Sequence, residues 1–229
     1  MSTHPLIDDL VRTFKAEGRI VIVGASLAGL RAAEALRDEG FTGSLTIIGD
    51  EVHEPYDRPP LSKQVLKGWV PAGNTKLPRL REVNADWRLG VAATGLDRDN
   101  REVLLANGDK VPYDRLLIAT GVRSRAWFNP EEAKLKGLYT LRTSDDAAKI
   151  QAAFKAKPKR VLIVGAGFIG SEMASVCREL GLEVTVAERS SAPLVGPLGG
   201  VIGDIAAKMQ RDAGVDLRTG VAVEALEGD

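Results

Sequence analysis

The sequence predicts an α/β fold made of two similar strand–turn–helix units, and two observations lead to this prediction. An apolar run that enters a glycine-rich turn occurs twice, at residues 20–29 and 161–170. β-Branched and aliphatic runs of this kind are typical of buried parallel strands. Small residues let such a turn approach a pyrophosphate, and the amides of the following helix favour the anion. We therefore expect two Rossmann-like dinucleotide-binding units in one chain.

The residues after the first turn continue the pattern of a nucleotide-binding unit. A helix is predicted over 30–39 with Gly40 as its stop, and a strand over 45–48 leads to Asp50. A carboxylate at the tip of this second strand can accept hydrogen bonds from both hydroxyls of an adenosine ribose. Ser26 stands where the second glycine usually lies. Serine is small enough for close approach, and its hydroxyl could reach a phosphate.

The second copy repeats these features with three glycines in the turn. Its helix is predicted to run to Leu180, with Gly181 as the stop, and a strand over 183–187 ends at Glu188. Glu188 would repel a 2′-phosphate, so NADH is expected in preference to NADPH, although the neighbouring Arg189 could accept that phosphate. For both copies the alternative is an ordinary strand–turn–helix unit whose glycines serve packing.

Composition excludes several other classes of protein. The 229 residues include 31 basic and 31 acidic side chains, so no overall charge attracts nucleic acid or an anionic membrane. No apolar stretch has the length of a membrane span, and residues 1–5 lack the pattern of a secretory leader, which predicts a cytoplasmic protein. The one cysteine, Cys177, excludes an internal disulfide and is expected to be a buried thiol. His4 and His53 offer no metal-binding spacing, and no metal site is predicted.

The remaining elements are short. The apolar spacing of residues 5–17 predicts a leader helix that ends at Gly18. Two consecutive prolines in the loop over 54–63 are expected to keep its backbone extended. Alternating patterns predict further strands, with a hairpin turn at Asn107-Gly108, near 87–96, 101–105, 116–119 and 215–224.

Together these motifs resemble a known family. The chain is similar to the FAD-dependent NADH:ferredoxin reductases of the putidaredoxin reductase type, which have a pyridine nucleotide-disulfide oxidoreductase fold resembling that of glutathione reductase. The motifs that carry the resemblance lie in the family's order and cover the chain from residue 19 onward, at 24–29, 55–63, 117–121, 141–143 and 165–172.

The resemblance implies FAD at the first turn and NADH at the second. For FAD it implies these residues: Gly24, Ser26, Ala28, Gly29, Asp50, Arg58, Lys63, Ala93, Thr120, Gly121 and Arg142. For NADH it implies Gly165, Gly167, Ile169, Gly170 and Glu188. It also implies that Lys63 and Glu172 form an ion pair at the hydride-transfer site. Solvated surface charge is the alternative for Arg58, Lys63 and Arg142, and a favourable helix dipole is the alternative for Glu172.

We expect a leader helix over 1–18, the first segment of an FAD-binding domain over 19–125 and an incomplete NAD-binding domain over 126–229. Members of the resembled family continue well beyond this point, so the chain is expected to be truncated, and a partner chain is one source of the missing region. The expected function is electron transfer from NADH through flavin to a ferredoxin-type iron–sulfur protein. The alternative is a catalytically inactive remnant that only binds nucleotides.

Overall fold

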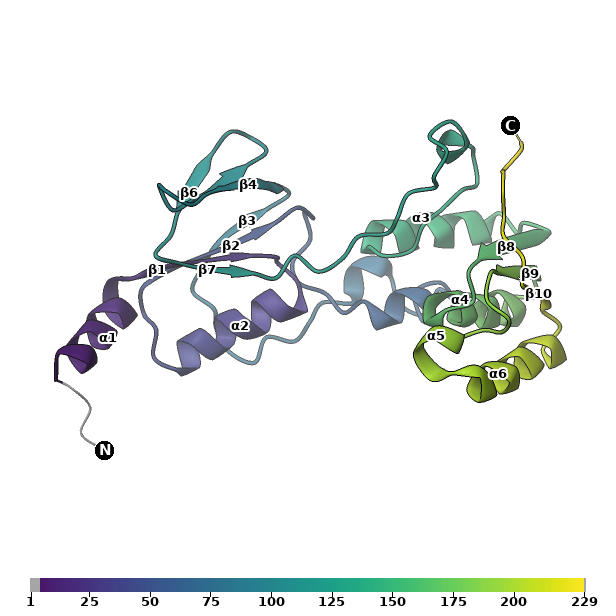
Figure 1. Ribbon diagram of the computed structural model, residues 1–229, viewed down its shortest axis with the longest axis horizontal. Coiled ribbons are helices and arrows are strands. Elements are labelled where there is room, and N and C mark those ends of the chain that lie inside the picture. The colour runs from purple at the N-terminus through teal and green to yellow at the C-terminus, as the bar shows by residue number, and fades with distance from the viewer. Residues whose placement is uncertain (1–4, 229) are drawn as a thin grey trace. The chain divides into compact units, whose positions relative to one another are not determined.

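The computed structural model describes residues 5–228, which divide into two compact units (Figure 1). The first unit comprises residues 5–57 and 76–122, and the second comprises 58–75 and 123–228. The loop at 58–75 therefore packs with the second unit, whereas the sequence grouped it with the first. Residues 1–4 of the expected leader and His4 lie outside the described residues. The assignment of one cofactor to each domain stays a prediction.

The first unit contains a parallel and an antiparallel sheet. The parallel sheet has the strand order β3-β2-β1-β7, and the antiparallel sheet has the order β4-β5-β6. The elements of this unit are α1 (Pro5–Glu17), β1 (Arg19–Val23), α2 (Leu27–Asp38), β2 (Ser44–Gly49), β3 (Asp86–Leu89), β4 (Ala93–Asp97), β5 (Glu102–Leu105), β6 (Lys110–Pro112) and β7 (Arg115–Ile118).

Alternation along the central strands gives this unit three layers. Ile22 and Ile47 point to one face of the parallel sheet, where they pack against Leu30 of α2. Val21 points to the other face and packs against Val103 of the antiparallel sheet. Figure 1 shows α2 and the β4–β6 sheet on opposite sides of the parallel strands. A strand buried on both faces reads as a continuous apolar run, which is why the sequence signal for β1 is strong.

The second unit is built around a three-stranded parallel sheet in the order β10-β9-β8. Its core joins Ile163 and Val186 of the sheet to Cys177 of α4 and Ala207 of α6. The elements of this unit are η1 (Pro59–Ser62), η2 (Ala72–Asn74), η3 (Glu132–Lys134), α3 (Ser144–Lys155), β8 (Arg160–Val164), α4 (Phe168–Glu179), β9 (Glu183–Glu188), α5 (Val195–Leu198), α6 (Gly200–Asp212) and β10 (Asp216–Thr219).

Most predicted elements are confirmed within two or three residues. The leader helix over 5–17 is α1, and both strand–turn–helix–strand units are present. Gly40 and Gly181 follow their helices with φ values of 80° and 77°, the left-handed conformation that ends many helices at glycine. The hairpin turn at Asn107-Gly108 joins β5 to β6, with Gly108 at a φ of 90°.

Three predictions about local structure are wrong. The strand near 87–96 is two strands in different sheets, because Gly90 adopts a φ of 77° and breaks the run. The strand over 215–224 ends at Thr219, since Gly220 has a φ of 69°. The two prolines at 59 and 60 begin the 3₁₀ helix η1 instead of an extended segment. Proline suits the first positions of a helix, where its missing N–H is not needed.

One charged contact fixes the entry of β1 beside β7. The Arg19 side chain donates to Asp114 from Nη2 at 2.8 Å and from Nε at 3.2 Å, and the Arg19 backbone N–H donates to the same carboxylate at 2.8 Å. The hydrogen bonds from the Arg19 side chain and backbone lower the pKa of Asp114 to about 2. Because this pKa lies below the ordinary value of about 4, the pair stabilises the fold above pH 4. Its contribution is lost as the pH falls toward 2.

We expect Asp114→Asn to lower the free energy of unfolding at pH 7 by about 0.5–1 kcal/mol, since the pair is partly screened by solvent. The difference from wild type should shrink between pH 4 and pH 2. Urea unfolding at a series of pH values measures both effects. Asp99→Asn, at an exposed hairpin position, is the control and should differ little from wild type at any pH. An equal loss in both variants would contradict this account.

Candidate nucleotide-binding site

The first glycine turn brings α2 into direct contact with the end of β1. A Cβ atom on Gly29 would lie 1.9 Å from the carbonyl oxygen of Gly24, so only glycine permits this approach. Gly24 has a φ of 127°, and a Cβ there would lie 2.0 Å from the carbonyl oxygen of Ala119. Ser26 is the N-cap of α2 and makes no side-chain capping hydrogen bond. Ala28 follows in the first turn of the helix. The amide end of α2 is therefore open to an anion.

The second turn has the same backbone geometry with more space in front of it. A Cβ atom on Gly170 would lie 2.0 Å from the carbonyl oxygen of Gly165, which repeats the helix contact of the first turn. Gly165 has a φ of 98°, and Gly167 is the N-cap of α4. A Cβ atom on either residue would meet no atom within 4 Å. The exposed Ile169 follows in the helix. A ligand can thus approach this backbone closely.

The structure gathers three more predicted residues of the first unit at its turn. Gly24 N–H donates to the carbonyl of Ile48 at 2.8 Å, so the end of β2, which leads to the exposed Asp50, lies beside the turn. A Cβ on Gly24 would also lie 3.1 Å from the amide nitrogen of Thr120, which places the β7 end there too. Gly121 follows with a φ of 66°. The carboxyl ends of three parallel strands therefore meet at this edge, where α/β folds bind ligands.

Glu188 ties the end of β9 to the second turn. Its Oε2 accepts a hydrogen bond from the backbone N–H of Ala166 at 2.6 Å, and its Oε1 accepts one from the N–H of Ser190 at 2.6 Å. Burial of the carboxyl opposes ionisation, but these hydrogen bonds outweigh it and hold the pKa of Glu188 below its usual range. The side chain is therefore an anion at neutral pH, and each oxygen has a further lone pair for another donor.

Lys63 and Glu172 form the ion pair that the resemblance implies. Lys63 Nζ lies 2.9 Å from Glu172 Oε1 and also donates to the carbonyl of Pro59 at 3.1 Å. The other carboxylate oxygen of Glu172 accepts a hydrogen bond from the hydroxyl of Ser62 at 2.5 Å. Burial opposes ionisation of Glu172, yet its contacts with Ser62 and Lys63 lower its pKa. The end of η1 and the second turn of α4 thus hold a lysine and an ionised carboxylate in fixed positions.

The other predicted residues are placed less directly. Arg58 donates from Nη1 to the carbonyl of Arg142 at 2.9 Å, so both belong to the second unit. The N–H of Arg142 donates to Asp146, which also caps α3 together with Thr143. Ala93 begins β4 in the first unit. The eleven residues implied for FAD are therefore divided between the two units.

The family model for pyridine nucleotide-disulphide oxidoreductases matches residues 18–229. The chain belongs to this family. The match covers both glycine turns, both strand-tip acids and the Lys63–Glu172 pair. It accounts for two nucleotide-binding units in one chain, and it confirms the fold class and the resemblance.

Similar members of the family are reductase components of bacterial dioxygenases. The chain is 38% identical over 212 residues to the ferredoxin reductase component of chlorobenzene dioxygenase from Cupriavidus sp. (strain PS12), covering 92% of this chain and 51% of the relative. It is 39% identical to the ferredoxin–NAD(+) reductase subunit of the benzene 1,2-dioxygenase system of Pseudomonas putida, covering 91% and 52%. The chain thus spans about half the length of these relatives.

Solved structures of ferredoxin reductases also resemble this chain. The chain matches the reductase-containing covalent putidaredoxin reductase–putidaredoxin complex with a TM-score of 0.87 at 32% identity. The match covers 93% of this chain and 52% of the solved chain. A ferredoxin reductase for the CYP199A2 system from Rhodopseudomonas palustris matches with a TM-score of 0.83, also at 32% identity. The fold of this half of the family is therefore the fold of the present chain.

Cys177 does not contribute a redox disulfide, although the family name refers to disulphides. It is a free, fully buried thiol in the core of the second unit, as the sequence predicted. Burial raises its pKa to about 11, so the thiol is protonated and unreactive at neutral pH. Residues 5–228 contain no helix long and apolar enough to cross a membrane. In the same residues no three His, Cys, Asp or Glu side chains gather as they would around a metal ion.

Sequence reasoning gave no role to two groups that contact the predicted residues. Ser62 is 5% exposed and orients Glu172, and its position directly before Lys63 was the available signal. Its partner lies 110 residues away, a separation that a sequence motif does not bridge. The Ala166 amide, which binds Glu188, is a backbone group and leaves no side-chain signal.

The two glycines of the second turn should respond differently to substitution. Gly170→Ala places a methyl group against a backbone oxygen and should lower the free energy of unfolding by about 2–4 kcal/mol. Gly167→Ala meets open space at a φ of −71° and should cost less than about 1 kcal/mol, mainly through a poorer N-cap. Urea unfolding of both variants at pH 7 measures the contrast. Equal losses would show that the helix contact does not depend on Gly170.

Removing the Ser62 hydroxyl should shift the titration of Glu172. Ser62→Ala takes away a hydrogen bond to the carboxylate, so the pKa of Glu172 should rise toward its ordinary value. Carbon-13 NMR titration of the glutamate side chains measures the shift, with Glu172→Gln to assign the signal. Ser175→Ala, exposed on the same helix, is the control. If the pKa of Glu172 is the same in wild type, Ser62→Ala and Ser175→Ala, Ser62 does not act on this carboxylate.

Proposed function

We propose that this chain is the nucleotide-binding half of a flavoenzyme that passes electrons from NADH through FAD to a ferredoxin-type iron–sulfur protein. The observation that carries the proposal is the presence of two uncapped helix N-termini behind glycine turns, one in each unit, each with an acid at the tip of the next strand. One dinucleotide per unit is the use that this duplication supports best. The relatives' names as ferredoxin reductases support the choice of cofactors and acceptor.

The first unit fits the adenine dinucleotide part of FAD. Gly24 and Gly29 allow α2 to direct its first amides at a pyrophosphate, and Ser26 adds a hydroxyl donor at the same point. Asp50 follows the strand that lies beside the turn and is assigned to the ribose hydroxyls. We extend this assignment to the proposed FAD-binding segment over 19–125.

The second unit fits NADH. Gly167 is the N-cap of α4, a Cβ atom there would meet open space, and no side chain caps the helix. Glu188 is held in place by two backbone donors and keeps its charge, so it can accept from ribose hydroxyls and would repel a 2′-phosphate. This argument favours NADH over NADPH despite the exposed Arg189 beside it. The segment over 126–229 is the proposed NAD-binding part.

The Lys63–Glu172 pair is proposed as the polar element of the hydride-transfer site. When bound, FAD supplies the chemistry, acceptance of a hydride and release of single electrons. The protein then has to fix charge and exclude water. Lys63 is held by both Glu172 and the Pro59 carbonyl, and Ser62 fixes the other oxygen of Glu172. A carboxylate with a lowered pKa stays ionised at neutral pH, so its proposed role is electrostatic and not that of a proton donor.

Two finer statements complete the proposal. The acceptor is a ferredoxin-type iron–sulfur protein, and the remaining half of the relatives' length is needed for the full reaction, whether it comes from the same chain or another. We also propose the cytoplasm as the compartment.

Reduction of bound flavin by NADH tests the proposal. The chain is incubated with FAD, freed of excess cofactor and mixed with NADH under anaerobic conditions. We expect the protein to stay yellow after excess FAD is removed. The yellow colour should then bleach when NADH is added. Glu188→Ala should require roughly tenfold more NADH for the same bleaching, the effect of losing about 1.4 kcal/mol of binding, with FAD retention unchanged. Stopped-flow absorbance measures both quantities.

The matched control is Glu183→Ala, at the opposite end of the same strand, which should behave as wild type. A colourless chain whose melting temperature still rises with NADH would replace the electron-transfer proposal by nucleotide binding alone. Equal loss of FAD and NADH binding in Glu188→Ala would overturn the assignment of the second turn to NADH.

A further inference from the structure

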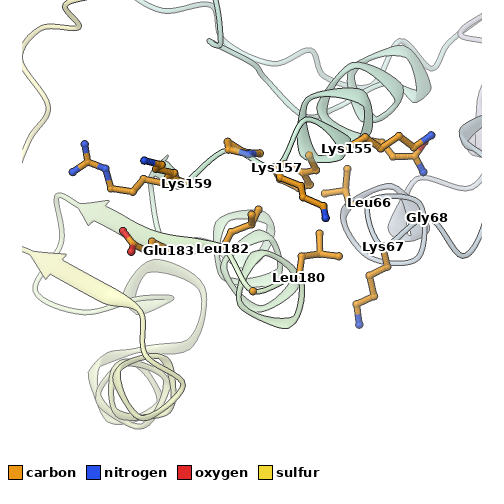
Figure 2. Close-up of a pocket in the computed structure, with 14 residues that line it drawn as sticks. Leu66, Lys67, Gly68, Lys155, Lys157, Lys159, Leu180, Leu182 and Glu183 are labelled. Carbon is orange, nitrogen blue, oxygen red and sulfur yellow. The ribbon is translucent and has the colours of Figure 1, made fainter.

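A cavity of about 810 Å³ lies in the second unit at the end of the sheet where β8 and β9 begin. Its walls come from the end of α3, the segment after η1 and the turn between α4 and β9 (Figure 2). The glycine turn follows the carboxyl end of β8, five residues further along. At about 3.3 Å per strand residue the two regions are roughly 15 Å apart. The cavity is therefore separate from the proposed NADH site.

The wall formed by residues 155–160 is strongly cationic. It contributes Lys155, Lys157, Lys159 and Arg160 to the cavity, and all four are exposed. Within residues 5–228 none of these four side chains has a hydrogen bond or an ion pair. One carboxylate, Glu183, lines the same cavity. Basic and acidic side chains are equal in number over the whole chain, so this concentration of positive charge is local.

Leucines line the cavity from the segment after η1 and from the turn between α4 and β9. Leu66 and Leu182 are 2% and 8% exposed, and Leu180 adds a side chain that is 40% exposed. Figure 2 shows Lys155, Lys157 and Lys159 along one side and Leu180 and Leu182 along the other. A cavity of this size with an apolar wall and a few polar groups at its rim is typical of small-molecule sites.

Contacts between the walls hold the cavity open. Gln151 of α3 donates from Nε2 to the carbonyl of Val65 at 2.6 Å, which ties α3 to the segment after η1. Lys67 in that segment forms an ion pair with Glu179 of α4. The charge of Lys67 is therefore paired within the protein. The four cations at 155–160 can contact a ligand instead. A preformed site loses less entropy on binding.

Lys157 adds an independent observation. It has a φ of 51°, in the left-handed region, directly after the C-cap residue of α3. Glycine is the usual residue at this position, because a side chain there is strained. Two other non-glycine residues among the described ones share this conformation, Arg101 and Leu194. Strain that is kept at a cavity wall points to a function for the side chain.

We propose that this cavity binds a small amphipathic anion, a carboxylate with an apolar body. The carboxylate would contact the lysines of residues 155–160, with Lys157 at the centre. The apolar body would lie against Leu66, Leu180 and Leu182. Neither group alone accounts for the arrangement, because cationic and apolar side chains line the same space.

Calorimetric titration of the chain with octanoate tests the proposal. Octanoate should bind more tightly than acetate, which lacks the apolar body, and more tightly than octan-1-ol, which lacks the charge. Lys157→Gly should weaken octanoate binding about tenfold, the loss expected for one charge-assisted contact. The same variant should raise the melting temperature, because glycine relieves the backbone strain. Leu180→Asp should abolish binding by placing a carboxylate in the apolar wall.

Arg101→Gly is the matched control, since it removes a cation from an equally strained position in the other unit. It should raise the melting temperature and leave octanoate binding unchanged. Binding of NADH should be unchanged in Lys157→Gly, which separates this test from that of the proposed function. Unchanged octanoate affinity in a folded Lys157→Gly, or equal affinity for octan-1-ol, would overturn the proposal. An equal loss in Arg101→Gly would do the same.

Discussion

Direct contact between a helix and the strand before it is the constraint on which both units depend. In each unit the last glycine of the turn lies against the backbone oxygen of the first, Gly29 against Gly24 and Gly170 against Gly165. No side chain fits at these contacts. The close approach places the first amides of α2 and α4 at the carboxyl edge of their sheets. The packing requirement and the ligand-binding geometry therefore have the same cause, and a glycine kept for one also serves the other.

The two turns use this shared geometry differently. The first is closed on one side, because the end of β7 lies against Gly24, and a serine occupies its N-cap. The second is open in front of Gly165 and Gly167, and the carboxylate of Glu188 holds it through the Ala166 amide. The difference follows from sheet order, because β1 lies between β2 and β7 whereas β8 is the edge strand of its sheet among the described residues.

How much could be predicted from the sequence depended on the distance between interacting residues. The strand–turn–helix units follow from local apolar runs and glycine spacing, so they were predictable. α3 was missed although Thr143 and Asp146 form a capping box, because the surrounding residues have a weak apolar pattern. The division of 87–96 into two strands depends on the φ of Gly90, which a periodic pattern does not reveal. The hydroxyl of Ser62 on Glu172 required the folded chain.

In the second unit, the acidic and the basic groups discussed above lie at opposite ends of the parallel sheet. At the carboxyl ends of β8 and β9 the ionised carboxylate of Glu188 accepts hydrogen bonds from two backbone amides. At the amino ends the cations of 155–160 have no carboxylate partner among the described residues, and they face leucines. Opposite ends of one parallel sheet can bind different anions without interference, since exposed charges separated by more than about 10 Å are largely screened by physiological salt. A ligand bound at the amino ends would affect the second glycine turn only by moving the strands themselves.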